Sequence, residues 1–184
     1  METSVIMSGF GGQGVLLIGS LLAQTAMNEG KEVAYMPSYG VEMRGGAAMC
    51  TVVISDRMVT SPVVGRPDAL IAFTGPALDK FGNRVRDGGL LILNTSMAPL
   101  NKVIRNDIKL IGVNLREEAE SINVPRGPNM IALGIYLAQT KIVKTLNIEA
   151  TFPEVIAEKY HTLIPSNMEA IKKGIEIGGR FGKK

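Results

Sequence analysis

A short apolar run followed by a cluster of glycines is the feature that most constrains the fold. Residues 5–7 are Val-Ile-Met, a run typical of a buried strand, and Gly9, Gly11 and Gly14 follow with the spacing G-x-G-x-x-G. The next segment, 15–27, is apolar on most sides and stops before Gly30, a favourable residue just beyond a helix end. A strand, a glycine turn and a largely buried helix, in this order, predict the start of an α/β fold.

The remaining apolar segments alternate between strand-like and helix-like patterns. Strands are expected at residues 32–36, 47–55, 68–73, 90–93 and 108–113, and helices at 76–85, 116–122, 128–141, 152–160 and 166–177. Continuous apolar strands separated by helices indicate a Rossmann-like α/β fold, a mainly parallel sheet flanked by helices. Residues 57–60 could return as a short arm, so that 47–60 would form a local antiparallel hairpin.

The size of the chain fits one domain. It has 184 residues, of which 46% are hydrophobic and 20% charged, enough apolar material to bury a core and too much for a disordered chain. No internal repeat, linker or low-complexity tract divides it. We therefore expect a single domain over 1–184, with C-terminal helices from about residue 151.

The composition excludes several kinds of site. With one Cys and one His, the chain cannot build a disulfide scaffold, a cysteine-ligated zinc site or an iron–sulfur cluster by itself. Cys50 lies in an apolar run and is expected to be buried, and His161 is expected at a helix end or on the surface. No catalytic residue and no metal ligand is predicted in this chain.

Charge and hydropathy argue against two classes of partner. The net charge is +3, the basic residues are dispersed except near the C-terminus, and Trp is absent, which does not favour nucleic-acid binding. The N-terminus lacks a basic signal region, and the longest apolar stretch, 15–26, is too short and too interrupted to span a bilayer. A cytoplasmic protein that binds no membrane is expected.

A second glycine-rich loop, 37–46, follows the second expected strand. Loops after the first two strands of a doubly wound sheet emerge at the same edge, so the two loops should be neighbours. Glycine turns and helix N-termini favour anions such as phosphate, but the same glycines could serve only close packing against a partner. The candidate ligand- or partner-binding residues are Gly9, Phe10, Gly11, Gly12, Gln13, Gly14, Ser38, Tyr39, Gly40, Glu42, Arg44, Gly45 and Gly46.

A standard dinucleotide site lacks one of its elements. Such sites place an acidic residue about 20 residues after the glycines, at the end of the second strand, to bind the ribose. Here no Asp or Glu follows that strand until Glu42, and the first basic residue is Arg44. NAD and NADP are therefore both disfavoured as ligands.

The two loops in tandem resemble the gamma subunit of the 2-oxoacid:ferredoxin oxidoreductases. The segments Ser61-Pro62, Pro67-Asp68 and 129–134 are also similar to that family, so the resemblance covers almost the whole chain. The second loop, with Tyr39 and Met43, resembles the 2-oxoglutarate branch more closely than the pyruvate branch.

The resemblance implies a role inside a multi-subunit enzyme. Such a complex converts a 2-oxoacid and coenzyme A into acyl-CoA, CO₂ and reduced ferredoxin. The family carries thiamine diphosphate, Mg²⁺ and iron–sulfur clusters on other subunits, so partners would be alpha and beta chains, a delta ferredoxin-like chain in some complexes, and ferredoxin as acceptor. The gamma chain would be inactive alone.

The sequence leaves three interpretations of what the chain itself does. The glycine loop could lie on the path of coenzyme A, whose phosphates suit a helix N-terminus, with Arg44 contacting a carboxylate, a phosphate or another subunit. The chain could instead be an assembly scaffold without ligand contact, or a stand-alone dinucleotide-binding oxidoreductase. The small residues Ala132, Gly134 and Ala138 could serve close packing either inside the chain or between subunits.

Overall fold

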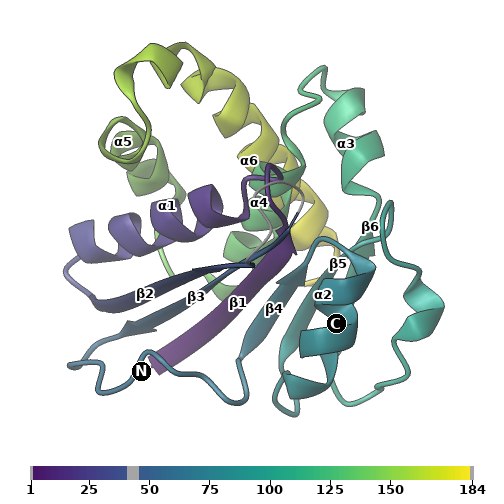
Figure 1. Cartoon of the computed structure of the whole chain (residues 1–184). Coiled ribbons are helices and arrows are strands. Elements are labelled where there is room, and N and C mark those ends of the chain that lie inside the picture. The colour runs from purple at the N-terminus through teal and green to yellow at the C-terminus, as the bar shows by residue number, and fades with distance from the viewer. Residues whose placement is uncertain (1, 41–45, 183–184) are drawn as a thin grey trace.

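One mixed β-sheet forms the centre of the molecule. The computed structural model describes residues 2–40 and 46–182. Over these residues the strand order is β2–β3–β1–β4–β5–β6 (Figure 1). The strands are β1 (Glu2–Phe10), β2 (Glu32–Tyr39), β3 (Ala47–Ser55), β4 (Ala69–Ala72), β5 (Leu90–Asn94) and β6 (Lys109–Val113).

The sheet is parallel except for one strand. β1, β4, β5 and β6 pair in parallel, whereas β3 lies between β1 and β2 and is antiparallel to both. The expected α/β fold with a local antiparallel element is thereby confirmed. The expected hairpin arm at 57–60 is wrong, because these residues form no strand and belong to the segment that leads from β3 back to β4.

β2 extends further than its sequence indicates. A strand over 32–36 that stops at Pro37 is expected, but β2 continues to Tyr39, with Pro37 opposite Cys50 of β3. Proline cannot donate a ladder hydrogen bond, and it is tolerated here because β2 is an edge strand with one strand neighbour. Ser38 and Tyr39 therefore lie at the end of a strand rather than in the loop.

Helices cover the two faces of the sheet unequally. α1 (Val15–Asn28), α4 (Pro128–Thr140), α5 (Thr145–Val155) and α6 (Ile164–Arg180) lie on one side of the sheet in Figure 1, and α2 (Gly75–Phe81) on the other. α3 (Leu115–Ser121) follows β6, and the 3₁₀ turns are η1 (Gly82–Arg84), η2 (Leu100–Lys102) and η3 (Glu158–Leu163). The larger core cluster lies under α1 and α4 and includes Met7, Ile18 and Ile131, and the smaller one, with Ile6, Leu70 and Phe81, lies under α2.

No helix in the described ranges is long and apolar enough to cross a membrane.

The C-terminal helices begin earlier than expected. The prediction of a helix over 152–160, with Pro153 near its start, is wrong. The prediction that the C-terminal helices begin at about residue 151 is also wrong. α5 begins at Thr145 and holds Pro153 in its last turn. The segment Glu158–Leu163 is a 3₁₀ turn, in which the His161 Nε2 lies 3.1 Å from the carbonyl oxygen of Ile156.

The small residues of α4 serve packing inside the chain. A β-carbon built on Gly134 would lie 2.9 Å from the Cα of Gly174 in α6, and one built on Gly174 would lie 2.9 Å from the Cα of Gly134. The Gln139 side chain donates to the carbonyl oxygen of Gly178 at 2.6 Å across the same contact. α4 and α6 therefore meet backbone to backbone at this crossing.

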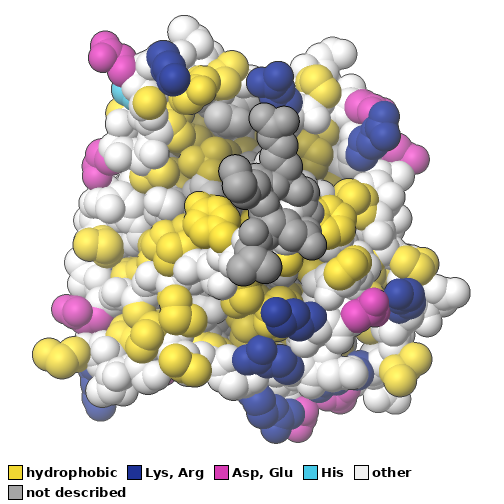
Figure 2. Space-filling view, viewed as in Figure 1, with side chains coloured by type: hydrophobic (Ala, Val, Ile, Leu, Met, Phe, Trp, Pro, Cys, Tyr) yellow, Lys and Arg dark blue, Asp and Glu magenta, His cyan; other side chains and the backbone are white. Residues whose placement is uncertain are grey.

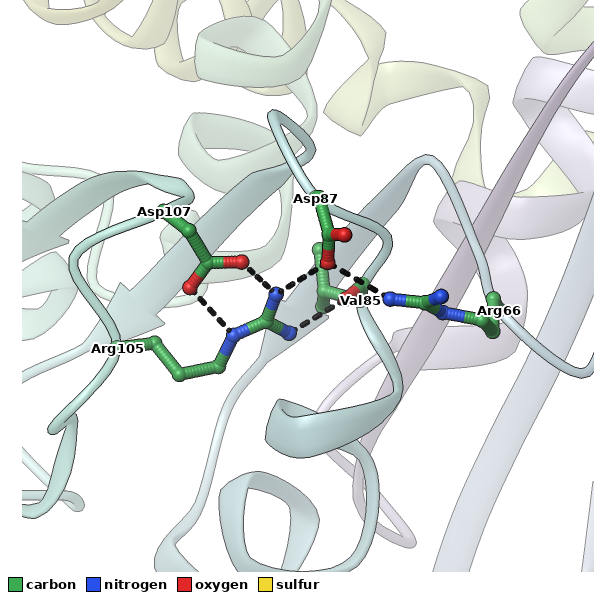
Figure 3. A network of polar contacts seen from close by, with 5 residues as sticks. All are labelled: Arg66, Val85, Asp87, Arg105 and Asp107. Carbon is green, nitrogen blue, oxygen red and sulfur yellow. Dashed lines mark hydrogen bonds and ion pairs between the residues drawn. The ribbon is translucent and has the colours of Figure 1, made fainter.

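A network of charged residues ties together the loops that precede β4, β5 and β6 (Figure 3). The Arg105 guanidinium donates to Asp107 at 2.9 Å, to Asp87 at 3.3 Å and to the carbonyl oxygen of Val85 at 2.5 Å. Arg66 reaches the same Asp87 oxygen at 2.7 Å. The neighbouring Arg105 lowers the pKa of Asp107 to about 2. This network lies at the end of the parallel strands opposite the glycine loop.

Candidate functional site at the carboxyl edge of the sheet

The glycine loop joins β1 to α1 by a turn that leaves no room for side chains at two positions. A β-carbon on Gly9 would lie 2.9 Å from the Cβ of Phe73, at the end of β4. Gly14, the residue that caps α1, has φ +70°, in the left-handed region, and a β-carbon there would lie 3.1 Å from the Asn129 side-chain Cγ. Glycine is required at both positions for close approach, and at Gly14 also for its backbone angle.

Gln13 fixes the shape of this loop. Its side-chain oxygen accepts a 2.7 Å hydrogen bond from the Phe10 backbone N–H, and its amide donates to the sulfur of Met97 at 3.1 Å. The Gln13 backbone N–H also donates to the Phe10 carbonyl oxygen at 3.2 Å. The loop is therefore closed on itself and tied to the segment after β5.

The two predicted loops are neighbours, as the sequence indicates. The backbone N–H of Gly11 donates to the carbonyl oxygen of Gly46 at 2.9 Å, and that of Gly40 donates to Ala47 at 2.7 Å. Tyr39 is 73% exposed at the end of β2. The candidates Glu42, Arg44 and Gly45 lie outside the described residues, so their predicted roles stay predictions.

A cavity of about 640 Å³ opens beside the glycine loop. It lies at the carboxyl ends of β1, β4 and β5, the usual ligand position in such sheets. Gly12, Gln13 and Gly14 line it on one side, and Asn129, Arg116 and Arg126 on the other. The sequence indicates the first group only, because the others lie more than a hundred residues further along the chain.

Asn94 holds the floor of the cavity. It ends β5, is 5% exposed, and donates from its side-chain nitrogen to the carbonyl oxygen of Phe73 at 3.2 Å. Its side-chain oxygen accepts from the Ser96 hydroxyl at 2.8 Å and from the Leu115 backbone N–H at 3.3 Å. One buried amide thus joins the end of β4, the loop after β5 and the start of α3.

The electrostatic character of the cavity favours an anion. The N-termini of α1 and α4 both border it, at Gly14 and at Pro128, and neither helix has an acidic residue in its first turn. Helix N-termini carry partial positive charge and free N–H groups. Arg126 is exposed and forms no ion pair within the described part of the chain, whereas Arg116 is paired with Glu120 at 2.9 Å.

Glu120 is the single acidic side chain among the described residues that line the cavity. It is paired with Arg116, so the described lining residues offer no free carboxylate of the kind that binds a dinucleotide ribose. In the described ranges no group of three His, Cys, Asp or Glu side chains is arranged to hold a metal ion. The described donors fit an anionic ligand better than a metal ion.

Cys50 lies beneath the first turn of α1, outside the cavity lining. Its thiol is 3.6 Å from the carbonyl oxygen of Val15, and burial raises its pKa to about 12. Since the thiolate is the reactive form of cysteine, this side chain is inert at neutral pH. The expectation of a buried Cys50 is confirmed.

Comparison with known proteins identifies the family. A family model for pyruvate ferredoxin/flavodoxin oxidoreductase matches residues 4–177. The chain belongs to this family. The solved gamma subunit of a keto/oxoacid ferredoxin oxidoreductase from Geobacter sulfurreducens has the same fold, with a TM-score of 0.77 and 29% identity over 96% of this chain and 98% of that one. The expected resemblance to a gamma subunit is confirmed.

Relatives within the oxidoreductase family differ in length, and their names give different substrates. Ketoisovalerate oxidoreductase subunit VorA of Methanothermobacter marburgensis is 43% identical over 137 residues, 74% of this chain but 28% of VorA. The chain thus spans less than a third of that longer relative. The 2-oxoglutarate synthase subunit KorC of Methanocaldococcus jannaschii is 31% identical over 179 residues, 96% of this chain and 94% of KorC. The expected preference for the 2-oxoglutarate branch stays a prediction.

Proposed function

We propose that this chain is the gamma-type subunit of a cytoplasmic 2-oxoacid:ferredoxin oxidoreductase, and that its cavity holds a phosphate-bearing part of coenzyme A. In the reaction, the 2-oxoacid loses CO₂, the remaining acyl group joins the coenzyme A thiol, and two electrons pass to ferredoxin with release of a proton. Alpha and beta chains, and a delta ferredoxin-like chain where present, would carry thiamine diphosphate, Mg²⁺ and the iron–sulfur clusters. The 2-oxoacid we favour is 2-oxoglutarate.

The observation that carries the proposal is the convergence of positive groups on one cavity. Two helix N-termini and Arg126, which has no ion-pair partner among the described residues, border the cavity beside the glycine loop. Guanidinium groups pair well with phosphate oxygens, and backbone N–H groups at helix starts add further donors. Coenzyme A is the phosphate-bearing substrate of the family's reaction, so it is the ligand that fits best.

This chain's contribution would be binding and positioning rather than chemistry. Gln13 and Asn94 hold the cavity walls, and Asn129 joins the starts of α1 and α4 through a 3.4 Å hydrogen bond to the Gly14 carbonyl oxygen. A rigid anchor for the phosphates would leave the thiol end of coenzyme A free to reach a centre on another subunit.

The test is steady-state kinetics of the complex assembled with its co-expressed partners. Arg126→Ala should raise the KM for coenzyme A roughly 3- to 10-fold and leave the KM for the oxoacid unchanged, as expected for loss of one charged hydrogen bond at a partly open site. Arg180→Ala, which removes an exposed arginine of α6, is the matched control. An unchanged KM for coenzyme A would remove the cavity from the binding path and favour the scaffold reading.

A further inference from the structure

Among the described elements, one half of the sheet has no helix standing over one of its faces. Val33 and Tyr35 of β2 and Cys50 and Val52 of β3 belong to the core cluster under α1. Side chains alternate along a strand, so Ala34 and Met36 of β2 and Met49 of β3 point to the opposite face. We call these three residues, with Thr51 and Val53 of β3, the β2–β3 face.

Apart from Met49, which packs against the core cluster under α2, the β2–β3 face is not covered by a described helix. α1 is the helix that lies against β2 and β3, and α2 lies against β1 and β4. In Figure 1, α2 stands beside β4, and the corresponding side of β2 and β3 carries no helix. Ala34, Met36 and Met49 remain partly exposed, whereas Thr51 and Val53 are each 2% exposed, so the β2–β3 face is only partly open to a partner.

The segment after β3 adds exposed apolar side chains to this region. Met58 is 79% exposed and Val63 is 72% exposed. Figure 2 shows hydrophobic side chains gathered over the part of the molecule where β2 and β3 lie in Figure 1. Exposed apolar side chains gathered in one region of a globular chain favour an interaction site there. β2 is also the free edge of the described sheet, which leaves backbone groups on its outer side open to a partner.

The border of this surface toward α2 is basic. Lys80 and Arg84 stack on the Phe81 ring at 5.2 and 5.3 Å from its centroid. Arg84 also donates to the carbonyl oxygens of Val64 at 2.8 Å and Gly65 at 3.2 Å, which places it next to Val63. Neither Lys80 nor Arg84 has a carboxylate partner in the described part of the chain. Figure 2 shows Lys and Arg side chains gathered at the lower centre, near α2.

This border favours one kind of occupant. A chain with acidic residues around an apolar centre is complementary in charge to it, because opposite charges across an interface attract.

The lengths of the relatives indicate which chain would bind to the β2–β3 face. In VorA of M. marburgensis the matched region is 28% of one longer polypeptide, so there the same unit works while covalently joined to a much larger part of the oxidoreductase. Domains joined in this way share an interface, typically of about 600–1,500 Å². The β2–β3 face is the part of this unit that its own helices leave available for such an interface.

We propose that the β2–β3 face, with Met58 and Val63 and the basic border of Lys80 and Arg84, docks an acidic-bordered surface of the larger oxidoreductase polypeptide. That polypeptide is the counterpart of the part of VorA outside the matched region. The proposal rests on the proposed function, because it needs a complex of oxidoreductase chains.

The test uses the tagged full chain co-expressed with that polypeptide. The double variant Met58→Glu/Val63→Glu changes two exposed side chains and should leave folding intact, which circular dichroism checks. We expect it to recover at least ~10-fold less partner than the wild type, and Lys80→Glu to weaken recovery in a salt-dependent way. The matched control is Leu146→Glu, which changes an 81% exposed leucine of α5 and should recover the partner normally.

The outcomes separate the docking surface from the proposed function. If the wild type recovers no oxidoreductase chain, the proposed function fails and this inference fails with it. If the wild type recovers an active complex and the double variant does so equally well, the function stands and the docking surface is overturned. If the isolated chain is a dimer that the double variant splits, the occupant is a second copy, and the proposal is again wrong.

Discussion

The side-chain amide of Asn129, at the start of α4, occupies the position that a β-carbon on Gly14, at the start of α1, would take, and it donates to the Gly14 carbonyl oxygen at 3.4 Å. The two residues are 115 positions apart in the chain. Their contact brings two helix N-termini to the same cavity, and this arrangement underlies the proposed anion site.

Gly14→Ala tests this contact. The substitution forces a side chain into the left-handed region, which costs about 1–2 kcal/mol, and against Asn129, which adds about 1–3 kcal/mol for overpacking. Gly12→Ala is the matched control, because Gly12 also has positive φ, +91°, but open space where the β-carbon would lie. Urea unfolding should show the larger loss of free energy for Gly14→Ala. Equal losses would mean that Asn129 simply moves aside.

The crossing of α4 and α6 gives a second prediction. Gly174→Ala places a methyl group against the backbone of α4 and should lower the free energy of unfolding by about 1–3 kcal/mol. Gly179→Ala, in the same helix but with nothing near its β-carbon position, should instead stabilise by up to about 1 kcal/mol. Thermal unfolding of the two variants measures the difference. If both variants shift the free energy of unfolding in the same direction, the close contact of the two helices at Gly174 does not determine the effect of the substitution there.

The buried thiol of Cys50 predicts a loss of stability at alkaline pH. Its pKa is raised from 9.0 to about 12 in the folded protein, so folding favours the neutral thiol. This stabilisation is fully present below pH 9 and is lost as the pH rises toward 12, by at most about 1.4 kcal/mol per pH unit. The pKa values of Tyr35 and Tyr136 are also raised from 10.0, so these two residues add to the loss as the pH approaches and passes 10. Cys50→Ala should therefore reduce the slope most strongly near pH 9, and an unchanged slope there would contradict the assignment.

Asn94→Asp tests the floor of the cavity. The variant places an oxygen against the Phe73 carbonyl oxygen and a negative charge beside the cavity, so it should lose about 1–3 kcal/mol of stability and weaken coenzyme A binding by the complex. Asn114→Asp is the control, because Asn114 caps α3 by accepting from Glu117 N–H and a carboxylate accepts equally well. Unfolding and coenzyme A titration should separate the two variants. Similar behaviour of both would show that Asn94 has no special role.

The fold was accessible from the sequence because its signals are local. The apolar run at 5–7, the glycines and the apolar helix lie next to one another, and the order of strands and helices predicts the sheet. The placement of β3 between β1 and β2 was not accessible, since antiparallel insertion depends on pairing between distant segments. The predicted end of a strand at Pro37 and the predicted start of a helix at Pro153 were both wrong, because an edge strand and the last turn of a helix tolerate proline.

The site was predictable only on one side. The glycine loop has a spacing that can be recognised, whereas Arg116, Arg126 and Asn129 belong to no motif and reach the cavity through the packing of α3 and α4. A helix start at Gly127-Pro128 was readable, but nothing local shows that it faces the same cavity as the start of α1. Asn94 appeared in the sequence only as the residue after a strand.

Amide hydrogen exchange of the glycine loop, residues 10–17, in the assembled complex with and without coenzyme A tests directly whether the cavity binds this ligand. We expect coenzyme A to slow exchange there and at residues 126–131, and Arg126→Ala to reduce this protection at a fixed coenzyme A concentration. Unchanged exchange in both segments at saturating coenzyme A would show that this cavity does not bind it.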